Sequence, residues 1–109
     1  MPLARLHTVL PAALLLFGAH SALAGIAEGR QKAQMCAACH GPWGQAAMPN
    51  TPHLAAQPAQ YLSDQLKAYR SGKRSHEIMS LIAKPLTDAE IADLSAWYAS
   101  LQIEVKPVP

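Results

Sequence analysis

The stretch Cys36-Ala37-Ala38-Cys39-His40 constrains this chain more than any other part of its sequence. Cys-x-x-Cys-His is the attachment pattern for c-type haem. In such a site two thiols bond covalently to the porphyrin, and the histidine that follows binds the iron. The chain contains two cysteines, and both lie in this motif. We therefore predict one covalent haem c, held by Cys36 and Cys39, with His40 as an axial ligand of the iron.

Two other interpretations of the cysteine pair require partners elsewhere in the chain. A thioredoxin-like redox pair accompanies a strand and a βαβ pattern. A structural zinc site needs two more ligands at short spacing. His53 and His76 are the other imidazoles after His40, and they are not spaced as a pair. Haem attachment is therefore favoured over both alternatives.

Residues 1–24 have the pattern of a secretory signal. Arg5 supplies a positive charge, residues 9–17 are almost wholly apolar, and Ala22-Leu23-Ala24 is a small-residue cleavage site. The apolar run is shorter than the roughly 20 residues that span a bilayer, which disfavours the alternative of a retained membrane anchor. We expect a mature chain that starts at Gly25 and is exported to the periplasm. Export agrees with the motif, because bacteria attach haem covalently outside the cytoplasm.

Residues 25–109 have the size of one small domain, which would be marginally stable without a covalent staple. A covalently attached haem would supply that staple, so we expect the chain without haem to be largely unfolded. Acidic and basic residues are nearly balanced, which excludes a nucleic-acid binding surface. The cluster of Arg70, Lys73 and Arg74 could steer a redox partner, although a solvated turn after a helix explains it as well.

The remaining patterns predict short helices and no strand, and so an all-α fold. Thr87 and Glu90 form a capping box at the start of an apolar stripe with helical spacing. Gly29 and Ala33 place small residues on one face of the first helix, where we expect Trp97 or Tyr98 to pack. The expected helices cover residues 26–35 (continuing into the haem motif), 58–69, 77–83 and 87–101, with a Pro-rich loop at 41–57 and a frayed tail at 102–109.

The second axial ligand decides what a haem iron at this site can do. A thioether closes the iron to other ligands and favours electron transfer, whereas an open position permits gas binding or peroxide chemistry. Met79 follows a helix and a turn, which gives the chain ample length to reach the opposite face of a porphyrin. The alternatives are Met48, His76, His53 or no protein ligand at all.

These residues, taken in order, resemble the small bacterial class I c-type cytochromes. The likeness is greatest to single-haem cytochrome c-553 types and to each half of the two-haem cytochrome c-four type. It runs from Gly29 through the haem motif to Trp97-Tyr98, although the family often has glycine where Ala56 stands. The segments that carry it are residues 36–41, 52–57, 61–62, 65–74, 79, 86–94 and 97–98.

The resemblance implies a cytochrome c fold of short helices around one haem, with Met79 as the axial methionine. It also implies periplasmic or membrane redox proteins as partners. The balanced charge predicts no nucleic-acid partner, and no second apolar stretch of spanning length follows the signal, so we expect no stable membrane insertion after signal cleavage. We therefore expect a periplasmic electron carrier rather than an enzyme. The alternatives are a haem c subunit of an exported dehydrogenase and, third, a haem enzyme or gas sensor with an open iron site.

Overall fold

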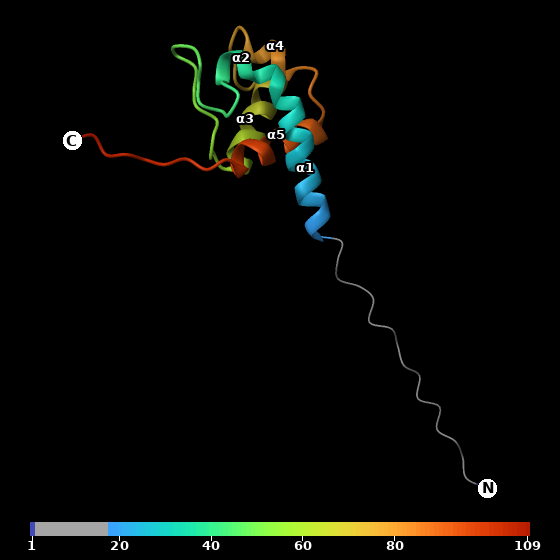
Figure 1. Ribbon diagram of the computed structural model, residues 1–109. Helices are drawn as coiled ribbons and strands as arrows, with labels where there is room; N and C mark the ends of the chain where they lie inside the picture. Colours follow the sequence, from blue (N-terminus) through green and yellow to red (C-terminus); the bar gives the residue numbers. More distant parts are fainter. Residues whose placement is uncertain (2–17) are drawn as a thin grey trace.

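The computed structural model describes Met1 and residues 18–109, with side chains from Gly25 onward, and this part of the chain is helical without strands (Figure 1). The all-α prediction is therefore confirmed. The predicted signal, residues 1–24, lies outside the described residues except for Met1 and the backbone of 18–24. The helices are α1 (Gly18–Lys32), the 3-10 helix η1 (Ala33–Cys36), α2 (Ala37–His40), α3 (Ala59–Ser71), α4 (Met79–Ala83) and α5 (Asp88–Ser100).

The helix boundaries follow the sequence pattern closely, with local differences. The first helical segment begins before residue 26 and tightens into η1, which ends on the first cysteine of the haem motif. Pro58 is the N-cap of α3 and not a first-turn residue, while Gly72 ends that helix in the left-handed conformation, as expected. The segment predicted at 77–83 forms a helix only from Met79.

The capping box at the start of α5 is confirmed. The Thr87 hydroxyl accepts the backbone N–H of Glu90, and the Glu90 carboxylate accepts the backbone N–H of Thr87. The same carboxylate pairs with Lys32 at the end of α1, and this contact holds the pKa of Glu90 below its usual range. One side chain therefore caps α5 and ties it to α1.

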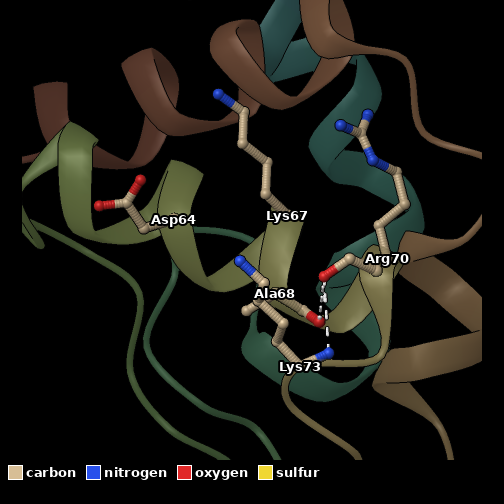
Figure 2. A pocket seen from close by; sticks show the side chains of 6 residues that line it. Asp64, Lys67, Ala68, Arg70 and Lys73 are labelled. Atoms are coloured by element: carbon tan, nitrogen blue, oxygen red, sulfur yellow. Dashed lines mark hydrogen bonds between the residues drawn. The ribbon is translucent and has the colours of Figure 1, made fainter.

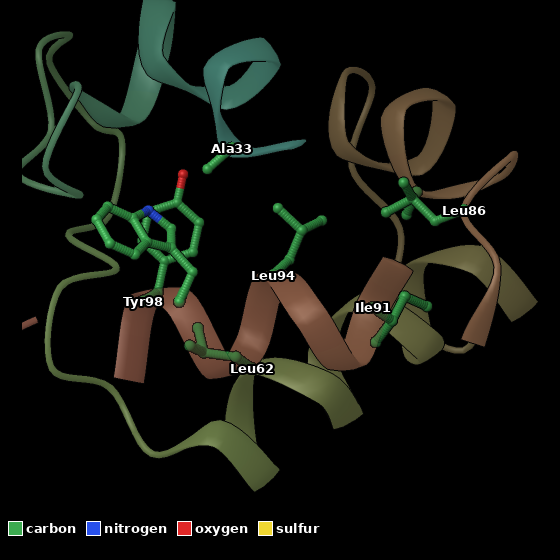
Figure 3. Close-up of a cluster of buried hydrophobic side chains, with 8 residues drawn as sticks. Ala33, Leu62, Leu86, Ile91, Leu94 and Tyr98 are labelled. Carbon is green, nitrogen blue, oxygen red and sulfur yellow. The ribbon is translucent and has the colours of Figure 1, made fainter. Parts of the chain in front are cut away.

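The core forms where α1 and α3 pack against α5. Gly29 permits the close crossing of α1 and α5, because a Cβ there would lie 2.0 Å from the Asp93 carbonyl oxygen and 2.8 Å from the Trp97 Cβ. We expected Trp97 or Tyr98 at this crossing, and it is Trp97 that packs on Gly29. Figure 3 shows α5 side chains meeting those of neighbouring elements in one cluster of Ala33, Leu62, Ala83, Leu86, Ile91, Leu94, Trp97 and Tyr98.

The loop between α2 and α3 lacks regular structure, as predicted, and two of its non-glycine residues, Asn50 and Ala56, have a positive φ. Asparagine tolerates this left-handed conformation better than alanine does. Ala56 has a φ of 61°, while its N–H donates to the Tyr98 carbonyl at 2.9 Å. The left-handed region costs a non-glycine residue about 1–2 kcal/mol, and glycine avoids that cost.

Ala56→Gly is therefore expected to stabilise the protein by about 0.5–1 kcal/mol, after the larger backbone entropy of glycine in the unfolded chain is subtracted. Denaturant unfolding followed by circular dichroism measures the change. Ala55→Gly is the matched control, because Ala55 is buried and has no positive φ. That substitution should destabilise the protein. A loss of stability in Ala56→Gly would contradict the backbone geometry.

Residues 102–109 carry no regular secondary structure and extend away from the helices (Figure 1). Within the described part of the chain, no helix has the length and apolar character needed to cross a membrane.

Candidate functional site

The cysteine and histidine side chains of the motif are placed by a short, tightly wound helical segment. Cys36 ends η1, and Cys39 and His40 lie in α2, which ends at His40 and has Gly41 as its C-cap. Residues three and four apart share one face of a helix, so the segment presents both thiols and the imidazole on one side. Gly41 has a φ of 79°, and a Cβ there would lie 1.8 Å from the Gln45 carbonyl oxygen, so the turn that follows requires glycine.

The ring of His40 is held in one orientation by the backbone. His40 is buried, and its Nδ1 lies 2.9 Å from the carbonyl oxygen of Pro52. A carbonyl can only accept a hydrogen bond, so Nδ1 carries the proton and Nε2 keeps its lone pair. An imidazole in this tautomer, with its N–H held by a carbonyl, is the usual form of a metal-binding histidine.

In His53 and His76 the Nδ1 atom accepts a hydrogen bond, whereas in His40 it donates one. The Nδ1 of His53 accepts the Ala46 N–H at 2.8 Å, and the Nδ1 of His76 accepts the N–H groups of Ile78 and Met79, each at 3.2 Å. A ring that accepts at Nδ1 carries its proton on Nε2 when neutral, and so offers no free lone pair to a metal. Of these three histidines, only His40 is prepared as a ligand, which disfavours His53 and His76 as the second axial group.

The two thiols are free and only partly exposed. Burial raises the pKa of the Cys36 thiol, whereas the reactive thiol of a redox pair has a lowered pKa. Within the described residues no strand precedes the motif, and no group of three or more His, Cys, Asp or Glu side chains is arranged to hold a metal ion. The local structure therefore disfavours both a thioredoxin-like pair and a zinc site.

Another buried polar atom near the motif is compatible with a cofactor. The Tyr98 hydroxyl is buried without a hydrogen-bond partner in the described structure. Tyr98 lies beside Cys36, and burial raises the pKa of its hydroxyl. The thiol next to it is only a weak acceptor. This donor, the free thiols and the oriented His40 together fit a cofactor that bears polar groups.

The methionines differ in exposure. Met35 and Met48 are 48% and 50% exposed, whereas Met79 is half-buried at the start of α4. Figure 1 places α4 and α2 at the same end of the helical body. Met79 is therefore a candidate sulfur ligand for a group bound at α2.

The basic cluster near the end of α3 has structural partners. Arg70 donates to the Leu86 carbonyl and to Asp88, and Arg74 donates to Gln65 and stacks on Tyr69. The Arg70 guanidinium also holds the pKa of the Asp88 carboxyl below its usual range. These contacts support the simpler interpretation of the cluster, a solvated turn fixed by local bonds.

A shallow hollow of about 410 Å³ lies beside this turn (Figure 2). The Ser71 hydroxyl spans its edge by donating to the Ala68 carbonyl and accepting the Lys73 N–H. The hollow contains no cysteine, histidine or methionine, so it is not the site of the motif. Its lining consists of Asp64, Lys67, Ala68, Arg70, Ser71 and Lys73.

The sequence did not predict that the carbonyl of Pro52 would accept the hydrogen bond of His40. A backbone acceptor leaves no side-chain pattern, so only its place in the Pro-rich loop could have indicated it. The side chain of Trp43 belongs to the same loop. It is 55% exposed, and Arg30 lies over both its ring and that of Trp97, at 5.5 and 5.6 Å from the ring centroids.

The sequence of this chain is similar to those of known proteins. The family model described as Cytochrome c matches residues 26–102. Cytochrome c-554(548) of Halomonas halodenitrificans is 43% identical over 77 residues, which cover 68% of this chain and 93% of that protein. The thiosulfate dehydrogenase electron acceptor of Thiomonas intermedia is 39% identical over 90 residues, covering 82% of this chain and 42% of that protein.

Solved structures show the same likeness. Cytochrome c4 of Acidithiobacillus ferrooxidans superposes with a TM-score of 0.67 at 36% sequence identity, covering 72% of this chain and 50% of that one. Reduced cytochrome c4 of Pseudomonas stutzeri gives 0.69 at 26% identity, covering 73% of this chain and 50% of that one. The chain thus spans about half the length of both solved structures, and less than half of the Thiomonas relative.

Proposed function

Because the chain belongs to the cytochrome c family and so binds haem c covalently, we propose that it is a periplasmic one-electron carrier with His40 and Met79 as the axial ligands. Cys36 and Cys39 hold the porphyrin by thioether bonds. The single observation that carries the proposal is the hydrogen bond from His40 to the Pro52 carbonyl, which leaves Nε2 free at a Cys-x-x-Cys-His motif.

Bound haem supplies an iron that cycles between Fe(III) and Fe(II). The residues of the chain keep the iron coordination the same in both states. His40 is fixed by burial and by its hydrogen bond to the Pro52 carbonyl. Met79 lies at the first turn of α4, and its backbone N–H donates to the Nδ1 of His76. A thioether at the second position favours Fe(II) and excludes small ligands. This arrangement suits electron transfer rather than catalysis at the iron.

The names of the relatives suggest where the electrons come from. Relatives in Thiomonas intermedia and Stutzerimonas stutzeri are named as the electron acceptors of a thiosulfate dehydrogenase. We propose that this chain likewise accepts electrons from an oxidoreductase outside the cytoplasm. A permanent haem c subunit of an exported dehydrogenase is the second candidate. Co-purification of a catalytic subunit at micromolar concentration would favour that candidate over a free carrier.

Met79→Ala tests the second axial ligand. The variant is expected to keep its covalent haem but to lose the thioether-to-iron absorption band of the oxidised form, because no sulfur then reaches the iron. Its reduced form should also bind carbon monoxide at neutral pH, while the parent protein should not. Optical spectra measure both changes, and Met48→Ala is the control that should match the parent. Loss of the band in Met48→Ala, with retention in Met79→Ala, would refute the ligand assignment.

A further inference from the structure

The hydrogen bond between His40 and the Pro52 carbonyl depends on how the loop of residues 41–57 is folded. Two arms of that loop lie together, since the N–H groups of Leu54 and Ala55 donate to the Gly44 carbonyl at 2.7 and 3.1 Å. The Pro52 carbonyl belongs to the peptide unit that joins Pro52 to His53. Whatever fixes His53 and Leu54 therefore fixes the direction of this carbonyl.

The side chain of His53 bridges the two arms. Its Nδ1 accepts the N–H of Ala46 at 2.8 Å, and the neighbouring Ala47 N–H donates to the Cys39 carbonyl at 3.0 Å. The imidazole thus connects the peptide that holds His40 to a loop arm anchored on the haem motif. Pro52 has no N–H, so its own backbone adds no donor to this arm.

We propose that His53 is a positioning residue: by accepting the Ala46 N–H it holds the Pro52 carbonyl on the Nδ1–H of His40, and so sets how strongly His40 donates electrons to a bound haem iron. A histidine ligand becomes more basic when its other N–H is well bonded. Stronger donation stabilises Fe(III) over Fe(II) and lowers the reduction potential. This inference rests on the proposed ligation by His40.

The matched pair His53→Asn and His53→Gln tests the proposal. The amide oxygen of asparagine can occupy the place of Nδ1 and accept the Ala46 N–H, whereas glutamine carries its oxygen one bond further out. In the exported haem protein, His53→Asn is expected to keep the parental potential. His53→Gln is expected to raise it, with up to about a tenfold change in the reduction equilibrium, which is about 59 mV for one electron.

A second readout follows the hydrogen bond itself. In the reduced protein, the His40 Nδ1 proton should exchange with solvent several times faster in His53→Gln than in the parent or in His53→Asn, as measured by nuclear magnetic resonance. Gln45→Ala, an exposed substitution in the same loop, should change neither the potential nor the exchange. Equal behaviour of the Asn and Gln variants in both readouts would overturn the proposal.

A failure of the His53 proposal can be distinguished from a failure of the proposed function. The parent spectrum reports whether His40 and Met79 bind the iron, independently of any change at His53. If the parent lacks the thioether band, the function proposed above fails. If the band is present but the Asn and Gln variants do not differ, only the role of His53 fails.

Discussion

Replacing Gly29 with alanine is expected to lower the free energy of unfolding by about 3 kcal/mol. The added Cβ would lie 2.0 Å from the Asp93 carbonyl oxygen and 2.5 Å from its carbonyl carbon. These are backbone atoms of α5 and cannot rotate away, so α1 and α5 would have to separate. The crossing organises the core around Trp97, and such a loss is a large part of the total stability of a small domain. Denaturant unfolding followed by far-ultraviolet circular dichroism measures it.

Gly72→Ala is the control for this prediction. Gly72 has a φ of 82° and nothing within 4 Å of an added Cβ, so only backbone strain opposes alanine there. We expect that variant to lose about 1 kcal/mol. If Gly29→Ala costs no more than Gly72→Ala, the close crossing of α1 and α5 is wrong.

Replacing both Cys36 and Cys39 with alanine is expected to remove haem from the purified protein and to leave most of the chain unfolded. No thioether bond can then form, so any haem is lost on denaturing chromatography. A domain this small is only marginally stable without a staple, so losing the covalent haem is expected to unfold it. The expected result is a colourless protein with little helical circular dichroism and no cooperative unfolding transition.

Met79→Ala is the matched control for the double cysteine variant, because it removes an iron ligand and leaves both thioether bonds. It should stay coloured and helical. A double cysteine variant with parental helix content and a cooperative transition would show that the folded state does not depend on attached haem. The prediction that the chain without haem is unfolded would then be wrong.

Local patterns in the sequence were enough to predict most of the fold. The capping box of Thr87 and Glu90 depends on residues three apart. The prediction that Trp97 or Tyr98 packs on Gly29 needs only helical spacing and residue size. Gly72 marks the end of α3 for the same local reason. Such signals can be recognised in the sequence because each lies within a short stretch of chain.

The parts of the site that were not predicted depend on contacts between distant segments. The Pro52 carbonyl meets His40 across a loop, and a backbone oxygen has no sequence signature. The tautomers of His53 and His76 follow from their N–H donors, which only the folded loop and the start of α4 place. The sequence shows alanine at position 56, where the family often has glycine, but it does not show that this residue has a positive φ.

The most direct test of the account is the intact mass of the exported protein under denaturing conditions, recorded with its optical spectrum. We predict the mass of residues 25–109 plus one haem, and a haem spectrum that remains with the chain after denaturation. A colourless protein with the mass of the bare chain would contradict the account.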